Sequence, residues 1–328
     1  MTTGSPPRRG GAGPRSTGAR VVALGGGHGL AATLRALRRV TDDITAVVAV
    51  SDDGGSSGRL RQEFDVVPPG DLRMALAALC GDDTWGRTWS RVVQHRFAGT
   101  GDLAGHCLGN LLITALWEQT GDIVTGLDWV GALLGAHGRV LPVATEPLQI
   151  VADVAGLHPE DASIVEQVVG QVEVATTRGE VVGLHVEPSD ARACPAAVEA
   201  IGEAEAIVLG PGSWFTSVLA PLQVRGIGDA VCTAQARVVV VLNLAPQPGE
   251  TSGFSPQRHL EVLAARMPSL RVDTVLADPA AVSDVDALAT AAASLGSRLA
   301  LAPVASRDGS PRHDVDLLAS ALGGVLAG

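Results

Sequence analysis

The stretch "RVVALGGGHGLAATLRALRRV", residues 20–40, decides the fold. It begins with a short β-branched apolar run, passes through a group of glycines and continues with apolar residues at helical spacing. A second pattern typical of a buried strand, "ITAVVAV", follows at 44–50. Two strands joined through a helix within about thirty residues form a βαβ unit, which requires parallel strands. We therefore expect a parallel sheet that begins near residue 20.

Strand patterns return in the second half of the chain and alternate there with helical ones. The expected strands lie at 206–210, 236–245, 272–279 and 298–305, and the expected helices at 213–226, 255–267 and 284–296. This alternation predicts an α/β fold with a Rossmann-like, doubly wound, mostly parallel sheet. The segment "PRHDVDLLASALGGVL" (311–326) predicts a capped amphipathic helix that closes the fold.

The middle of the chain differs from both halves. Residues 70–136 have almost wholly helical patterns, whereas residues 139–188 have the patterns of β-hairpins, with a turn at 178–179. We expect one domain over 19–328 that carries a helical insertion and a small β insertion. Residues 1–18 are rich in Gly, Pro, Ser and Arg and contain no apolar segment. They predict a disordered N-terminal tail and not a signal peptide.

Charge and composition exclude several classes of protein. The formal net charge of -11 argues against nucleic acid and against an anionic membrane surface as partners. No run reaches the roughly 20 apolar residues of a membrane span. The four cysteines lie far apart, which indicates reduced thiols in a cytoplasmic protein and no zinc site. All 24 basic side chains are arginines, so the chain has no Schiff-base lysine and no lysine-dependent P-loop.

The first group of glycines has the spacing of a dinucleotide-binding loop. From Gly27 it reads Gly-x-Gly-x-x-Ala, and it lies between a strand and a helix. Glycine allows the backbone to approach phosphate oxygens closely, and the N-terminus of the following helix directs free amides at them. A tight turn without any ligand is the alternative. The residues predicted to meet phosphate here are Gly25, Gly26, Gly27, His28 and Gly29.

A second glycine loop, "VLGPGSWFTSVLAPL" (208–222), repeats this arrangement in the other half of the chain. An ordinary capped helix is the alternative interpretation. Because both loops follow strands, the switch-point rule for open sheets places them at one cleft. The residues predicted to bind phosphate in this loop are Gly210, Gly212, Ser213 and Thr216.

Two adjacent acids, Asp52 and Asp53, follow the second strand, about 20 residues beyond the first glycine loop. One acid at this distance suits the ribose of a dinucleotide, as in an NAD-dependent oxidoreductase. Two carboxylates beside phosphate-binding loops suit Mg²⁺, or hydrogen bonds to a sugar or a base. An Asx-turn with an N-cap is the structural alternative. Asp52 and Asp53 are therefore the candidate metal ligands and the candidate catalytic residues.

Other polar residues are placed where they could line the same cleft. His106 and Asn110 lie four residues apart and so share a helical face, while Arg312 precedes the last helix and could bind a diphosphate with both arms of its guanidinium. Surface charges, or core pairs that satisfy each other, are the alternatives. The remaining pocket candidates are Asp71, Arg73 and Asn243, the last of which opens a polar loop with Gln247, Glu250 and Thr251.

With these motifs assembled, the chain resembles the family of the gluconeogenesis factors (YvcK-like) and the 2-phospho-L-lactate transferases (CofD-like), and its motifs favour the first branch. The resemblance rests on "ALGGGHGLAATLRAL", "VSDDGGSSGRLRQEFDVVPPGDLRMALAAL", "LAGHCLGNLL", "GRVLPVATEPL", "VLGPGSWFTSVLAPLQVRGI", "NLAPQPGETSGFS" and "RHD". It implies a Rossmann-like fold with insertions, a nucleotide ligand whose phosphates meet both glycine loops, an acidic pair at Asp52 and Asp53, and a homodimer. It also assigns the diphosphate of a nucleotide sugar to Arg312.

The gluconeogenesis-factor branch implies a cytoplasmic regulator that binds a UDP-N-acetylglucosamine-type ligand and links carbon metabolism to cell shape and cell-wall synthesis, with a regulatory protein as partner. The transferase branch implies an enzyme that uses a GDP-linked donor with Mg²⁺. His28 and Met74 stand where the family commonly has threonine and often has asparagine. The chain shows no evident nucleophile, lysine or Cys–His pair, which favours the regulator without a catalytic role. An NAD-dependent oxidoreductase is the third hypothesis.

Overall fold

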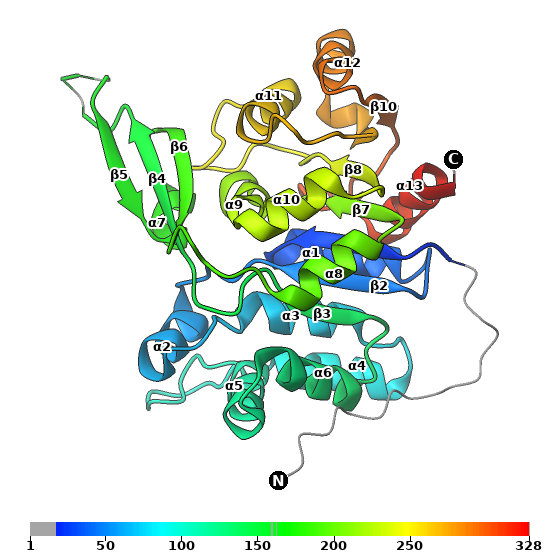
Figure 1. The fold of residues 1–328 in the computed structure, drawn as a ribbon. Coiled ribbons are helices and arrows are strands. Elements are labelled where there is room, and N and C mark those ends of the chain that lie inside the picture. The colour runs from blue at the N-terminus through cyan, green and yellow to red at the C-terminus, as the bar shows by residue number, and fades with distance from the viewer. Residues whose placement is uncertain (1–17, 159, 162, 328) are drawn as a thin grey trace.

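The computed structural model describes residues 18–158, 160–161 and 163–327. The tail predicted for 1–18 lies outside them except for Gly18. In the described part of the chain, seven strands form one wholly parallel sheet with the order β10-β9-β8-β7-β1-β2-β3 (Figure 1). They are β1 (Val21–Gly25), β2 (Ile44–Val48), β3 (Arg139–Pro142), β7 (Ala206–Leu209), β8 (Arg237–Val241), β9 (Thr274–Ala277) and β10 (Arg298–Leu301). The predicted α/β fold with a Rossmann-like parallel sheet is confirmed.

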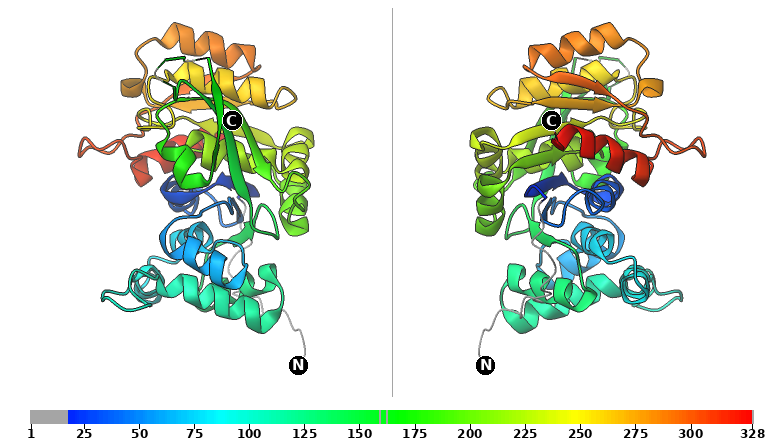
Figure 2. Two further views of the ribbon diagram at one scale, coloured as in Figure 1. Left: turned by 90° about the vertical axis from the view of Figure 1, so that its left-hand side faces the viewer. Right: turned by 90° about the vertical axis from the view of Figure 1, so that its right-hand side faces the viewer.

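The strand order places a switch point between β1 and β7. The chain runs outward from β1 through β2 to β3, returns to β7 on the other side of β1, and then runs outward to β10. Right-handed crossovers on the two sides of such a point put their helices on opposite faces. Accordingly α1 (Gly27–Leu37), α3 (Gly70–Leu79) and α13 (Val315–Ala327) pack together, whereas α8 (Pro195–Glu203) packs with α10 (Arg225–Thr233) (Figure 2).

The core consists of the strands and the apolar faces of these helices. Residues of β1 and β7 are buried without exception, because helices cover both faces of the parallel sheet. Trp214 and Phe215, directly behind the second glycine loop, are the largest of the fully buried side chains. The C-terminal helix is capped as the sequence predicts: the carboxylate of Asp314 accepts hydrogen bonds from the amides of Asp316 and Leu317.

Between β2 and β3 the chain is helical. These helices are α2 (Gly55–Phe64), α3, α4 (Thr84–Gln94), α5 (Leu108–Thr120) and α6 (Ile123–Leu134). Asp83 and Asp122 cap α4 and α6 by accepting amide hydrogen bonds from Gly86 and Thr125. Of these helices, α3 packs against α1 and its Asp71 reaches the first glycine loop, while α5 and α6 pack together at the far side of this layer (Figure 1).

The segment expected as a β insertion differs from its prediction in two places. Arg139–Pro142 pairs with β2 and is therefore part of the main sheet. Gln171–Thr176 forms a short helix, α7, where the first arm of a hairpin was expected, because a carboxylate distant in sequence accepts hydrogen bonds from its first amides. The described strands β4 (Gln149–Ala155), β5 (Val165–Val169) and β6 (Glu180–Glu187) form a small antiparallel sheet that projects from the body (Figure 1).

The second half supplies further helices. The helix expected at 213–226 is divided into a π-helical turn η1 (Trp214–Leu219), α9 (Ala220–Gln223) and the start of α10, whereas the other two expectations hold as α11 (Pro256–Arg266) and α12 (Val285–Ser294). A short 3₁₀ turn, η2, covers Pro279–Ala281. Within the described ranges, no helix combines the length and the apolar character needed to cross a membrane. Cys80, Cys107, Cys194 and Cys232 are all free thiols.

Candidate functional site

The two glycine loops lie in contact at the carboxyl ends of β1 and β7. A Cβ atom on Gly29 would lie 1.9 Å from the carbonyl oxygen of Pro211, so only glycine allows the loops to approach this closely. Thr33 ties them further, because its hydroxyl donates a hydrogen bond of 3.2 Å to the carbonyl of Gly210. The segments around Gly29 and Pro211, which are about 180 residues apart in sequence, thus form one surface at the switch point.

The first loop is partly the first turn of α1, because this helix begins at Gly27, within the group of glycines. Its N-cap, Gly26, has no side chain with which to cap the helix. Gly27 has φ +59°, and a Cβ atom placed on it would meet no atom within 4 Å. His28 is exposed. The space beside Gly27 at the N-terminus of α1 is therefore open to a ligand, while the amide of Gly27 itself is engaged by the carboxylate of Asp71.

One carboxylate, that of Asp71 at the start of α3, reaches this loop. Its Oδ2 would lie 2.5 Å from a Cβ atom on Gly26. Burial, and to a smaller extent the charge of Asp52, raise the pKa of Asp71 to about 7 against the opposing effects of the Gly27 amide and the Arg73 guanidinium. Asp71 can therefore hold or release a proton near neutral pH, directly beside the amides of α1.

The second loop is bonded internally. The carboxylate of Glu250 accepts hydrogen bonds of 2.9 Å from the amides of both Phe215 and Thr216, and one of 2.6 Å from the hydroxyl of Ser213. Burial raises the pKa of Glu250, and these hydrogen bonds oppose that shift. The phosphate contacts expected of Ser213 and Thr216 stay a prediction, since a phosphate there would have to replace this carboxylate.

Asn243 holds the same loop from the end of β8. Its Oδ1 accepts a hydrogen bond of 2.9 Å from the amide of Gly212, and its Nδ2 donates one of 2.7 Å to the carbonyl of Gly212. Both ends of this side-chain amide are thus engaged by the glycine backbone. In this structure Asn243 supports the shape of the loop.

The adjacent acids Asp52 and Asp53 serve different elements. Asp52 accepts a hydrogen bond of 3.1 Å from the amide of Gly54, an Asx-turn, whereas Asp53 accepts hydrogen bonds of 2.8 and 3.1 Å from the amides of Gln171 and Val172 at the start of α7. Residues 18–158, 160–161 and 163–327 hold no group of three or more His, Cys, Asp or Glu side chains suited to a metal ion. The two carboxylates thus bond to different backbone segments, and their proposed role as Mg²⁺ ligands stays a prediction. The carboxylates that interact electrostatically at the cleft are Asp52 and Asp71.

Three of the pocket candidates belong to one buried chain of hydrogen bonds. Arg73 Nε donates to Asn110 Oδ1 over 2.8 Å, and Asn110 Nδ2 donates to the hydroxyl of Ser56 over 3.0 Å. His106 Nδ1 is also 3.0 Å from this hydroxyl. The sequence placed His106 and Asn110 together but gave no signal for Ser56, which joins them from α2.

Arg312 is exposed in the loop between β10 and α13, where its backbone bonds to Ser306 and Ser310. The neighbouring His313 is anchored at the end of β8: burial lowers its pKa to about 4, and a hydrogen bond to the backbone of Leu242 and the charge of Asp278 oppose that shift. Arg312 thus belongs to the carboxyl side of the sheet. No contact between its side chain and a glycine loop is found in the described part of the chain, so its diphosphate role stays a prediction.

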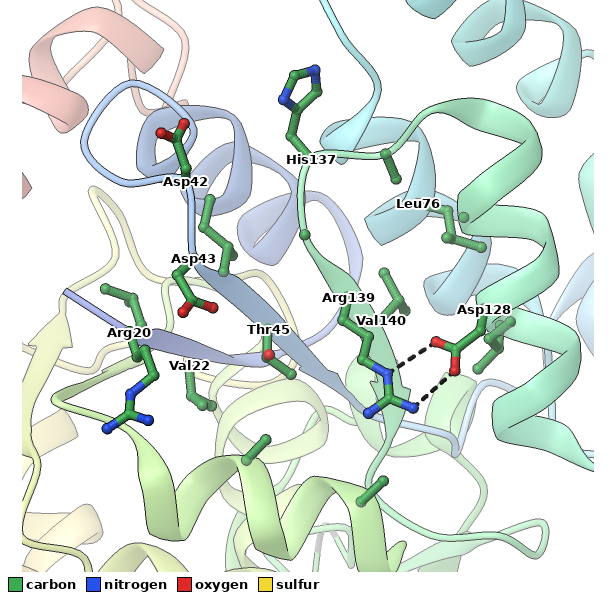
Figure 3. A pocket seen from close by; sticks show the side chains of 18 of the residues that line it. Arg20, Val22, Asp42, Asp43, Thr45, Leu76, Asp128, His137, Arg139 and Val140 are labelled. Atoms are coloured by element: carbon green, nitrogen blue, oxygen red, sulfur yellow. Dashed lines mark hydrogen bonds and ion pairs between the residues drawn. The ribbon is translucent and has the colours of Figure 1, made fainter. Parts of the chain in front are cut away.

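A groove of about 910 Å³ lies elsewhere, over the beginnings of β1, β2 and β3 and between α6 and α8 (Figure 3). Arg139 and Asp128 face each other in it through hydrogen bonds of 2.9 and 2.8 Å. This groove is wide, but its half-buried Arg139 and Asp128 are already paired, and no residue of a glycine loop is among those that line it. Parallel sheets of this kind bind ligands at the carboxyl ends of their strands, which favours the glycine loops as the site.

Comparisons with known proteins agree with this placement of the motifs. The family model described as 2-phospho-L-lactate transferase CofD matches residues 21–298. A gluconeogenesis factor from Bacillus subtilis (strain 168) is 36% identical over 265 residues, which are 81% of this chain and 80% of that protein. A protein from Mycobacterium tuberculosis (strain ATCC 25618 / H37Rv), provisionally given the same name, is 51% identical over 310 residues, 94% of this chain and 90% of that one.

A solved structure extends the comparison to the whole fold. The crystal structure of a member of the UPF0052 family from Bacillus halodurans superposes with a TM-score of 0.83 at 31% identity, covering 95% of this chain and 99% of that chain. The family model, the relatives and the solved fold all include both glycine loops within the matched region. The chain belongs to the CofD family, in the branch of the gluconeogenesis factors.

Proposed function

We propose that this protein binds a nucleotide sugar of the UDP-N-acetylglucosamine type and acts as a regulator without a catalytic role. The observation that supports this most is the contact between two glycine loops at the carboxyl ends of β1 and β7, with the N-terminus of α1 open beside it. A diphosphate supplies the anion for those amides. Arg312 is the residue we assign to the second phosphate, because a guanidinium binds phosphate oxygens with two parallel hydrogen bonds.

The proposed physiological role follows the names of the relatives. Proteins called gluconeogenesis factors share a third to a half of their residues with this chain. We propose that binding of the ligand signals the carbon supply of the cell. A protein partner then passes this signal to cell-shape and cell-wall synthesis. In this proposal the chain acts in the cytoplasm as a homodimer.

A transferase with a GDP-linked donor is the second candidate, and one observation favours it. Asp71, with its pKa raised to about 7, lies against the first glycine loop. A carboxylate of that pKa is suited to accept a proton from an attacking hydroxyl group. Asp71 would be the base in that case.

A ligand panel tests the two candidates by thermal unfolding of the full chain. UDP-N-acetylglucosamine, GDP with and without Mg²⁺, and NAD are compared at equal concentration. A ligand at a hundredfold excess over its Kd stabilises the folded state by about 2.7 kcal/mol. Stabilisation by UDP-N-acetylglucosamine alone supports the regulator, whereas consumption of a GDP-linked donor that is lost in Asp71→Asn supports the transferase. NAD as the preferred ligand contradicts both.

A pair of variants then locates the ligand. Gly27→Ala places a methyl group in the open space at the start of α1, and we expect it to weaken UDP-sugar binding at least about tenfold by blocking the phosphate. Gly121→Ala is its matched control, because Gly121 has a similar φ of +66° and equally open surroundings at the end of α5. Equal affinity in both variants would reject the first loop as the site. Arg312→Ala, with the exposed Arg307→Ala as control, tests the diphosphate role in the same way.

A further inference from the structure

Three arginines and a histidine gather beside the cleft without any ion pair. Arg59 lies on α2, Arg73 on α3, Arg96 directly after α4, and His106 before α5. Their charges interact: Arg96 acts on Arg73, and both Arg59 and Arg96 act on His106. None of the three guanidinium groups forms a salt bridge within the described ranges.

Arg73 is the buried base of this arginine cluster, which comprises Arg59, Arg73 and Arg96. Arg73 is only 7% exposed. Its Nε donates to the neutral Asn110, while its Nη1 and Nη2 have no hydrogen-bond partner among the residues that the structure describes. Burial lowers its pKa, although a guanidinium remains charged at any physiological pH. Neither Nη atom is among the buried polar atoms of the described chain that lack a partner, so both reach the surface, where an anion can contact them.

The surroundings of Arg73 are shaped to hold its side chain in place. A Cβ atom on Gly109 would lie 2.8 Å from the Cγ of Arg73 and 2.6 Å from the carbonyl oxygen of Val93. Glycine at the start of α5 therefore makes room for the arginine stem. Together with the hydrogen bond to Asn110, this packing fixes the direction of the guanidinium in advance of any ligand.

The other two arginines form the rim and bond only to carbonyl groups. Arg59 Nη2 donates to the carbonyl of Ala104 over 2.8 Å, and Arg96 Nη1 donates to that of Gly105. Each arginine uses some of its guanidinium N–H donors to hold the loop before α5, and its other N–H donors stay available to a ligand. Burial lowers the pKa of His106, and the charges of Arg59 and Arg96 lower it further. His106 therefore presents a neutral ring at neutral pH.

The acids that act on this cluster do not neutralise it by contact. Asp71 and Asp52 act on Arg73, and Glu63 acts on His106, but no carboxylate is hydrogen-bonded to any of the three guanidinium groups in the described chain. Asp71 carries only part of a negative charge near neutral pH, because its pKa is about 7. The site therefore keeps a net positive charge directly beside the cleft.

We propose that the arginine cluster is a second anion-binding site, which takes a phosphate or carboxylate group with Arg73 as its central ligand. The free Nη1 and Nη2 of Arg73 form the fork that binds two oxygens of such a group in parallel. Arg59 and Arg96 supply further charge at the rim. The site lies beyond Asp71 from the first glycine loop, and it stands whether or not the glycine loops bind a nucleotide sugar.

Titration calorimetry on the full chain tests this site with inorganic phosphate and with malonate, both at constant ionic strength. We expect Arg73→Gln to weaken anion binding at least about tenfold, because it removes a charge-assisted pair of hydrogen bonds, and Arg96→Gln to weaken it a few-fold. Arg91→Gln is the matched control, since Arg91 is an exposed arginine of α4, close in sequence to Arg96. It should bind both anions as the unaltered protein does. The preferred anion identifies the ligand group as phosphate or carboxylate.

Crystals soaked in tungstate, a heavy analogue of phosphate, locate the ion directly. An anomalous peak within hydrogen-bond distance of Arg73 supports the proposal. A peak at the first glycine loop alone, or unchanged anion binding in both Arg73→Gln and Arg96→Gln, overturns it and leaves the nucleotide-sugar proposal intact. Should Arg73→Gln fail to fold, Arg96→Gln against Arg91→Gln decides. Loss of UDP-sugar binding in Gly27→Ala, with tungstate still bound at Arg73, would separate the two sites.

Discussion

The two glycine loops are alike in sequence and unlike in structure. Both follow a buried strand and lead into a helix, yet the carboxylate of Glu250 bonds two amides and a hydroxyl behind the second loop, whereas at the first loop the carboxylate of Asp71 bonds the amide of Gly27 and the space beside Gly27 stays open. A glycine-rich strand-to-helix turn therefore identifies a place where amides converge. Whether those amides are free for a ligand depends on side chains that arrive from elsewhere in the fold.

The largest expected effect comes from separating the loops. Gly29→Ala puts a Cβ atom 1.9 Å from the carbonyl oxygen of Pro211. We expect the free energy of unfolding to fall by about 3 kcal/mol, because the backbone of one loop has to move away from the other. Denaturant unfolding measures this change. Gly324→Ala in α13 meets nothing within 4 Å and should be neutral or slightly stabilising; an equal loss in both variants would contradict the contact.

The next effect comes from removing the carboxylate that holds the second loop. Glu250→Ala removes the acceptor of the Phe215 and Thr216 amides, and we expect a loss of about 2 kcal/mol in the free energy of unfolding, since two buried donors lose their partner. Glu261→Ala on the surface of α11 is the control and should change stability by less than about 0.5 kcal/mol. If Glu250→Ala is as stable as the control, the second loop is less constrained than its hydrogen bonds indicate.

The third effect concerns the first loop and is measured as a change of stability with pH. The pKa of Asp71 is raised from 3.8 to about 7, so the folded state binds this proton more tightly than the unfolded state. Between those values the unfolded carboxyl has already lost its proton, and the free energy of unfolding falls as pH rises, by at most about 1.4 kcal/mol per pH unit.

Asp71→Asn should remove this slope, so its stability relative to the unaltered protein should increase from pH 4 to pH 7. Urea unfolding at a series of pH values measures the difference. The exposed Asp42→Asn serves as control and should follow the unaltered protein across the range. A difference that does not change with pH would mean that Asp71 is charged in the folded state throughout.

The sheet could be predicted from sequence because its strands are buried on both faces and read as continuous apolar runs. The segments at 206–210 and 272–279 contain β7 and β9, and the glycines between strand and helix mark the ends that face the cleft. The helix α7 could not be predicted. Its sequence alternates apolar and polar residues as a strand does, and the hydrogen bonds to Asp53 that stabilise it come from a residue more than a hundred positions away.

The site was only partly accessible to the same reasoning. Asp71, Arg73 and Asn110 were named as pocket candidates, and the structure places Asp71 against the first loop and joins Arg73 to Asn110 by a hydrogen bond. Ser56, Arg59 and Arg96 carried no signal. A serine in a glycine-rich turn and two arginines look like ordinary surface residues, and their meaning depends on which charges the fold brings near them.

Asp52 and Asp53 are adjacent in sequence but hold different parts of the structure, and they therefore connect those parts. One residue faces the cleft and the next anchors α7 and, with it, the small antiparallel sheet. A single peptide unit therefore joins the residue at the cleft to the residue that holds α7 and the projecting sheet. A change of the backbone at Asp52 would therefore also act on Asp53 and on the helix that it holds.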